Sequence, residues 1–325
     1  MYKKIFAIIA CFATFESFGD TVFVADPGSE DLIQNATELF NATKIVCSNI
    51  SDDISKVSKV SKVNTAVTAV GTAASGGALV AGLKKSQEEK QIDELIDKMC
   101  KDGGCNAETV RAMDLDEFYT KVMVPFSEIA TLQEKLERSK KLGNWRTGLM
   151  AGTIGTNLAS AILSGVNTNQ SDLIQHIEAC NSMIASLSNV SAKLRAAGVS
   201  PIDNPIVNKI DSARTWCTQI NTKDVEKIEN RMKGVMGTSI AGVVIGGVGT
   251  TTSAMANSDK YMNTKNRLSL TDEEKTKEKR LNTTANIMAG ANIGTGLVET
   301  GLNISLITLT KKMMRQAEQC EDIFK

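Results

Sequence analysis

The sequence of 325 residues predicts an all-α protein made of two tandem antiparallel hairpins of long helices with glycine-rich helix–helix seams. Apolar residues recur at three- and four-residue steps, as in Leu173, Ile177, Cys180 and Ile184, which is the period of one helix face. Two halves of the chain repeat one order of features, and the cysteines of each half lie at matching distances from its glycine-rich stretches. The alternation typical of a half-buried strand is not sustained anywhere in the sequence.

Residues 1–19 have the composition of a signal peptide. Two lysines precede the apolar run Ile5–Phe15, and Gly19 offers a small residue for cleavage. The run is shorter than the roughly 20 apolar residues that span a bilayer. Lipid attachment at Cys11 is the alternative, although only about six apolar residues would precede that cysteine. We therefore expect export to the periplasm or cell envelope of a bacterium, where the six remaining cysteines meet an oxidising compartment.

A short stretch with two prolines, residues 198–206, divides the mature chain and is typical of a linker. On either side of it follow a cysteine, an uncharged glycine-rich stretch, a charged connection, a second glycine-rich stretch and a closing cysteine. This similarity suggests duplicated helical hairpins. The expected divisions are a lead-in over residues 20–43, a first hairpin over 44–197 with the charged connection 84–146, and a second hairpin over 207–325 with the charged connection 259–280.

The spacing of the cysteines predicts two disulfides at the open ends of the hairpins. Measured from the glycine-rich stretches, the two arms are 30 and 28 residues long in the first half and 29 and 30 in the second. At 1.5 Å of rise per residue the mismatch is about 3 Å or less, within reach of a disulfide. The alternative is buried, unpaired thiols. The predicted pairs are Cys47–Cys180 and Cys217–Cys320, with Cys100–Cys105 closing a small loop.

The glycine-rich stretches cover residues 64–83, 147–171, 234–258 and 281–310. Small residues recur in them at three- and four-residue spacing, which lets two helix backbones approach closely. Each glycine in a helix interior destabilises the helix by up to about 1 kcal/mol relative to alanine. We therefore expect close packing between helices to offset this cost. The residues predicted to pack helices together are Gly71, Gly82, Gly148, Gly152, Gly242, Gly246, Gly290 and Gly294.

Two environments fit these stretches. Each stretch is long enough to cross a bilayer, and Glu299 is the one charged residue in the four. Thr, Ser, Asn and Gly nevertheless make each stretch only weakly apolar. A soluble bundle keeps all six cysteines in one oxidising space and is the favoured interpretation. Inserted hairpins are the alternative: seven Lys and Arg residues in 259–280 resemble a cytoplasmic loop, and Trp145 would mark a membrane interface.

Composition excludes several kinds of chemistry. Lys and Arg together number 37 and equal Asp and Glu, so the chain lacks the basic excess of a nucleic-acid binder. His176 is the single histidine and is expected on a helix surface rather than in a metal site. The acidic clusters 93–97 and 114–117 lack calcium-loop spacing and are expected to be solvated. Lys84 and Lys85 follow glycines, but without the contiguous pattern of a phosphate-binding loop.

These patterns predict no catalytic residue, no cofactor and no metal site. The expected function is that of an exported, non-enzymatic helical envelope protein with a structural or partner-binding role. Its partner would be an unidentified protein or a second copy, with membrane contact as a further expectation. The alternative is a membrane-inserting protein, transmembrane or pore-forming, that uses the glycine-rich hairpins.

Overall fold

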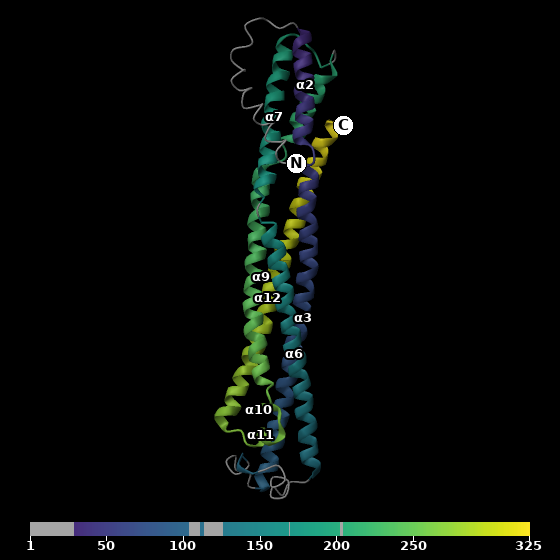
Figure 1. Ribbon diagram of the computed structural model, residues 1–325. Coiled ribbons are helices and arrows are strands. Elements are labelled where there is room, and N and C mark those ends of the chain that lie inside the picture. Colours follow the sequence, from purple (N-terminus) through teal and green to yellow (C-terminus); the bar gives the residue numbers. More distant parts are fainter. Residues whose placement is uncertain (1–28, 104–110, 114–125, 169, 202–203) are drawn as a thin grey trace. The chain divides into compact units, whose positions relative to one another are not determined.

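The computed structural model describes residues 29–103, 111–113, 126–168, 170–201 and 204–325 (Figure 1). In this part of the chain every regular element is a helix, and long helices pack against one another. The predicted all-α fold class is therefore confirmed. The helices are α2 (Ser29–Cys47), α3 (Ile50–Gly103), α6 (Phe126–Val166), α7 (Ser171–Ala196), α8 (Pro205–Cys217), α9 (Thr222–Ala256), α10 (Asp259–Met262), α11 (Thr264–Leu268) and α12 (Asp272–Ile323).

Local sequence signals account for where several helices begin. Asn204 caps α8 by accepting a hydrogen bond from the backbone N–H of Ile206, and Pro205 occupies the first helical position, where its missing N–H costs nothing. At the start of α12, Thr271 and Glu274 form a reciprocal capping box. The Glu274 carboxylate accepts from the Thr271 N–H (3.0 Å), and the Thr271 hydroxyl accepts from the Glu274 N–H (3.2 Å).

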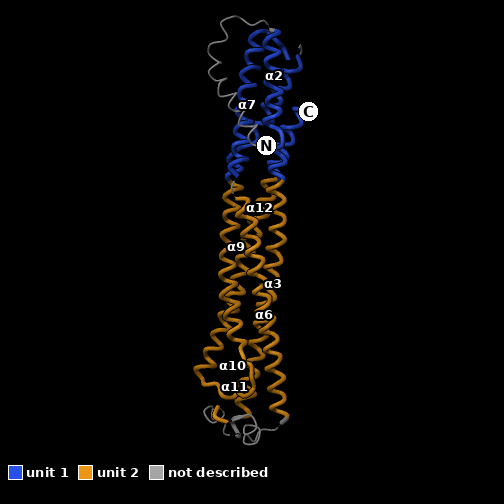
Figure 2. The backbone as a smooth tube through the Cα atoms, viewed as in Figure 1, with its two compact units in different colours: residues 1–55, 170–226, 311–325 blue, residues 56–169, 227–310 orange. Residues whose placement is uncertain are grey.

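Contacts divide the chain into two units (Figure 2). Unit 1 comprises residues 1–55, 170–226 and 311–325, and unit 2 comprises residues 56–169 and 227–310. This division differs from the predicted halves, because each unit takes residues from both sides of the linker 198–206. The physical reason is that a two-helix hairpin leaves one face of each helix uncovered, whereas four helices enclose a common interior.

Unit 1 has an ordinary apolar core. Helix α2 packs on α7, and α7 packs on α8. Phe40 of α2 and Ile177 of α7 are buried in this unit, as is Ile210 of α8. The ring of Phe40 lies 4.9 Å from the ring of Phe324, which joins the last turn of the chain to the core.

In unit 2, neighbouring helices are antiparallel. Asn64 of α3 donates to the Ser164 hydroxyl of α6 (2.7 Å). Ser75, eleven residues later on α3, contacts Thr153, which lies eleven residues earlier than Ser164 on α6 (3.2 Å between hydroxyl oxygens). These opposed steps fix the α3–α6 hairpin. The α9–α12 hairpin is antiparallel too, because Arg231 donates to the carbonyl of Ser305 (3.1 Å) and the later residue Gly249 lies against the earlier residue Met288.

The two hairpins pack together into one four-helix bundle. Between α6 and α9, Ser239 contacts Ser160 (3.0 Å between hydroxyl oxygens). Between α3 and α12, Thr68 donates to Glu299 (2.7 Å). A second contact lies farther along each pair: Arg146 of α6 donates to Ser253 of α9 (2.8 Å), and Asn282 of α12 donates to Glu89 of α3 (2.7 Å). In both pairs the residue number falls on one helix as it rises on the other, so all four neighbouring pairs of helices are antiparallel.

Candidate functional site

The interior of unit 2 follows a strict pattern of three- and four-residue steps made mainly of small and polar side chains. The steps are those of a left-handed coiled-coil seam. Small residues let the helices approach, and polar residues bond across the interior rather than to water. On α3 this pattern comprises seven buried positions, which are Asn64, Thr68, Gly71, Ser75, Ala78, Gly82 and Lys85.

Glu299 is the central charged group of this interior. Its side chain is 1% exposed and accepts hydrogen bonds from the hydroxyls of Thr68 (2.7 Å) and Ser160. Ser239 contacts the same Ser160 hydroxyl from α9 (3.0 Å), so all four helices contribute to one layer. Among the described residues, neither Lys nor Arg forms an ion pair with Glu299.

One helical turn away, a second polar layer lies beside the Glu299 layer. It contains Asn64, Ser164 and Asn303, all 1–2% exposed. Asn64 donates its amide N–H to Ser164, while its amide oxygen has no hydrogen-bond partner. The amide nitrogen of Asn303 also lacks a partner. The interior of the bundle therefore holds unused polar atoms next to a buried carboxylate.

Apolar side chains of the same four helices point outward. Sixteen of them, four on each helix, are 43–77% exposed, and we call them the apolar belt. On α3 they are Val63, Val70, Val80 and Leu83; on α6 they are Trp145, Leu158, Ile162 and Val166; on α9 they are Ile240, Val244, Val248 and Met255; on α12 they are Ile287, Leu297, Val298 and Ile304.

At one end the belt stops at the same level on all four helices, and at the other end it stops at one level on α3, α6 and α12, whereas on α9 it stops at Ile240, beside Ser239 in the Glu299 layer. At one end, Leu83, Trp145, Met255 and Ile287 all lie within two residues of the layer formed by Gly82, Arg146, Ser253 and Asn286. At the other end, Val63, Val166 and Ile304 lie within two residues of the Asn64, Ser164 and Asn303 layer. Val63 and Leu83 are 20 residues apart, which is about 30 Å along a helix.

Beyond the belt the same helices have the opposite pattern. Ile92 and Ile96 of α3 are buried against Leu132 and Leu136 of α6. Exposed positions of α3 in this region carry charge, as at Lys90. The reversal of polarity is therefore a property of the belt and not of the helices as a whole.

A buried ionic layer lies next to the Leu83 end of the belt. Lys85 pairs with Glu89, and Glu89 accepts hydrogen bonds from the Asn282 amide (2.7 and 2.9 Å). Arg146 donates to the amide oxygen of Asn282 (2.7 Å) and to Ser253 (2.8 Å). This layer links all four helices, because Lys85 also donates to a carbonyl of α9.

A second group of ion pairs lies farther from the belt and centres on Arg267 of α11. Arg267 is 1% exposed and pairs with Asp93 (2.7 Å) and with Glu278. Burial raises the pKa of Glu278 to about 7, and this effect outweighs the opposing attraction of Arg267. Burial also lowers the pKa of Lys85. This end of unit 2 holds the buried cations Lys85, Arg146 and Arg267, the buried anions Glu89 and Glu278, and the partly buried Asp93.

The predicted packing glycines divide into two groups. A Cβ added at Gly71, Gly82, Gly242 or Gly246 would collide with a side chain of a neighbouring helix. The expectation does not hold for Gly148, Gly152, Gly290 and Gly294, where a Cβ would meet nothing within 4 Å. On α6 and α12 the interior face is one step away from these glycines. It carries Met150, Thr153, Asn157, Ala289, Asn292 and Gly296 instead.

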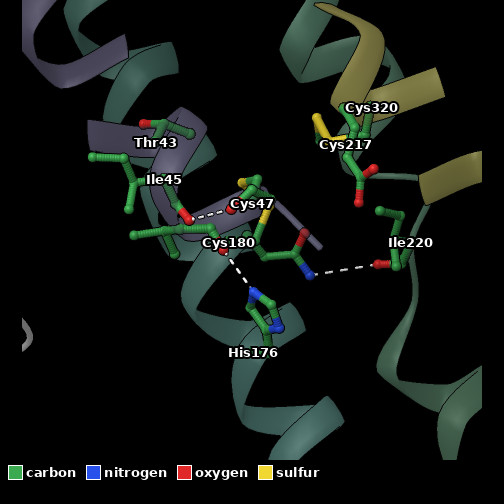
Figure 3. Close-up of a disulfide and its surroundings, with 12 residues drawn as sticks. Thr43, Ile45, Cys47, His176, Cys180, Cys217, Ile220 and Cys320 are labelled. Carbon is green, nitrogen blue, oxygen red and sulfur yellow. Dashed lines mark hydrogen bonds between the residues drawn. A yellow bond between two sulfur atoms is a disulfide. The ribbon is translucent and has the colours of Figure 1, made fainter. Parts of the chain in front are cut away.

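The structure pairs the cysteines of unit 1 as the arm lengths predict (Figure 3). Cys47 is bonded to Cys180 with their Cα atoms 4.9 Å apart, and Cys217 is bonded to Cys320 with a Cα separation of 4.7 Å. The Sγ atoms of Cys47, Cys180 and Cys320 lie within 4.8 Å of one another, so the two bridges share one core. Since all four sulfurs are bonded, none is available to a metal.

Other predicted residues have simpler positions. His176 is 27% exposed at its side chain and binds the carbonyl of Val46 (2.8 Å), with Asp53 3.4 Å away. Trp145 is 67% exposed at the end of the belt, and Trp216, beside Cys217, is 38% exposed. The signal peptide, the acidic cluster 114–117 and the pairing of Cys100 with Cys105 lie outside the described residues.

Three helical stretches of the described chain are long and apolar enough to cross a membrane, judged by length and composition: Glu30–Met99, Ser127–Ala196 and Pro205–Met262. They contain the belt segments of α3, α6 and α9 but not that of α12. Comparison of the chain with protein-family models, with curated proteins and with solved structures finds no match. The inference of function therefore depends on the geometry of unit 2.

Proposed function

We propose that the protein is an exported, non-enzymatic membrane protein of a bacterial envelope, and that the four helices of unit 2 span the bilayer. The apolar belt carries this proposal. A water-soluble bundle buries its apolar side chains and exposes its polar ones. Unit 2 exposes apolar side chains and buries mainly small and polar ones over about 30 Å of α3 and α6, which is the thickness of the hydrocarbon core of a bilayer.

Lipid fits this surface better than a protein partner does. The belt runs over all four helices, whereas a partner or a second copy would cover one side of the bundle. Large exposed apolar patches on soluble proteins are rare and local. Trp145 stands at one end of the belt, where an indole is favoured at a membrane–water interface.

The chain order supplies a topology. Along each helix, the Leu83 end of the belt leads to the charged connections 84–146 and 259–280. The opposite end leads to the segments that carry the disulfides. Disulfides persist in an oxidising space, and the seven Lys and Arg residues of 259–280 suit the cytoplasm. We place unit 1 outside the cytoplasmic membrane, where it would serve a structural or partner-binding role.

Carbonate extraction of native membranes tests the proposal. The protein should remain in the pellet after washing at alkaline pH, because its helices are embedded. Vesicles that contain the protein should retain a trapped dye, since side chains bonded across the interior fill the bundle. Release of the protein into the supernatant contradicts the proposal and favours a soluble envelope protein.

A further inference from the structure

We propose that Glu299, with Thr68, Ser160 and Ser239, forms an intramembrane binding site for Na⁺. This inference rests on the proposed membrane location of unit 2. Its starting point is a carboxylate that is 1% exposed, lies inside the apolar belt and receives only hydroxyl hydrogen bonds. An ionised side chain at such a depth is costly, and when present it usually marks a path or site for an ion.

The charge balance selects a monovalent cation. Glu299 supplies one negative charge, and no described Lys or Arg pairs with it. Arg146 is the other charged side chain within the limits of the belt, and it is engaged with Ser253 and Asn282 at the far end. A single positive charge makes the Glu299 layer neutral, whereas a divalent ion would leave an excess charge in the hydrocarbon region.

The surrounding atoms suit a small hard cation. Thr68, Ser160 and Ser239 bring three hydroxyl oxygens from three helices to the layer that contains the carboxylate. One turn away, the amide oxygen of Asn64 is buried and lacks a hydrogen-bond partner. Oxygen-only ligands of this kind bind cations such as Na⁺, and nitrogen or sulfur ligands are not needed. A proton is the competitor of Na⁺ for the same carboxylate.

Two measurements on detergent-solubilised protein test the site. In the first, thermal unfolding is followed in NaCl and in N-methylglucamine chloride at equal ionic strength. Na⁺ should raise the unfolding temperature by about 2–5 °C because it binds the folded state alone. The rise should disappear in Glu299→Gln. It should persist in Glu278→Gln, which alters a buried carboxylate outside the belt.

The second measurement requires no variant. Dicyclohexylcarbodiimide modifies a protonated carboxyl group in an apolar site, and bound Na⁺ displaces that proton. Modification of Glu299, located by mass spectrometry, should therefore slow at least severalfold when NaCl replaces N-methylglucamine chloride. Thr68→Val should shift the protective Na⁺ concentration upward, because it removes one ligand and keeps the shape of the side chain.

The outcomes separate this inference from the proposed function. Modification and unfolding that do not respond to Na⁺ overturn the site. An equal Na⁺ response in wild type and Glu299→Gln also overturns it. Carbonate extraction measures membrane insertion independently. A protein that resists extraction but does not respond to Na⁺ would therefore contradict the Na⁺ site and leave the proposed membrane location standing.

Discussion

At the scale of the residue, position on the helix decides what a glycine does. Gly249 of α9 faces the interior, where an added Cβ would lie 2.9 Å from the Cβ of Met288 and closer still to Met150. Gly247, two residues earlier, faces open space. The spacing of glycines in the sequence does not separate the two cases, because the seam also contains Ser, Thr and Asn.

This difference gives a matched pair of substitutions. Gly249→Ala should lower the free energy of unfolding by about 1–3 kcal/mol, because α9 and α12 must separate to admit the methyl group. Gly247→Ala should raise it by up to about 1 kcal/mol through helix propensity. Denaturant unfolding of the solubilised protein measures both, and equal effects would contradict the assignment of the two faces.

Glu278 makes stability depend on pH. Its pKa is raised from 4.5 to about 7, so between these pH values the folded protein binds more protons than the unfolded chain. Stability must therefore fall as pH rises from about 5 to 7, by an amount on the order of 2–3 kcal/mol. Unfolding midpoints at pH 5, 6, 7 and 8 should show this decline in wild type.

The control is Glu278→Gln, which keeps the size of the side chain and removes its titration. The decline between pH 5 and 7 should be smaller in this variant, because the glutamine remains neutral throughout. An unchanged pH profile would assign the dependence to another group.

At the scale of the element, one helix can serve two environments in succession. Helix α3 exposes Val63, Val70, Val80 and Leu83 in the belt and exposes charged residues such as Lys90 beyond it. Throughout both regions its buried positions keep the same three- and four-residue steps. The spacing of the buried positions on α3 is therefore the same in both regions, and only the environment of the outer face of the helix changes.

A charge placed on the outer face distinguishes lipid from water. Val70→Asp should impair membrane insertion, since a charged side chain near the centre of a spanning helix costs about 2.5–3.5 kcal/mol. Gln87→Asp, on an exposed position of α3 outside the belt, should insert normally. The fraction resistant to carbonate extraction is the measurement. Equal extraction of both variants would indicate that Val70 faces water.

At the scale of the whole molecule, the proposed topology places two parts of the chain on opposite sides of a membrane. Asn266→Cys and Ser186→Cys, each made in a chain with Cys100 and Cys105 replaced by Ser, carry an exposed thiol in α11 and in α7. An impermeant maleimide should label Ser186→Cys in spheroplasts. It should label Asn266→Cys only after permeabilisation. Labelling of both before permeabilisation would exclude the proposed orientation.

The disulfides are a second property at this scale. Peptide mapping without reduction should recover Cys47–Cys180 and Cys217–Cys320, and reduction should destabilise unit 1 by about 2–5 kcal/mol. Refolding from the reduced state should also yield some Cys47–Cys320 pairs, because these sulfurs lie within 4.8 Å in the native core. Recovery of other pairs from native protein would contradict the shared core.

The helical class, the antiparallel hairpins and the two described disulfide pairs were all readable from periodicity and arm length. These features depend on local propensity and on distance along the chain, which a sequence displays directly. Only the tertiary structure decided that the two hairpins share one interior, that Glu299 and Arg146 lie inside it, and that the valines and leucines lie outside. In a weakly apolar sequence the faces of a helix differ too little in polarity to show which face is covered by neighbouring helices. The covered face depends on packing between segments far apart in the chain, as with Thr68 and Glu299, which are 231 residues apart.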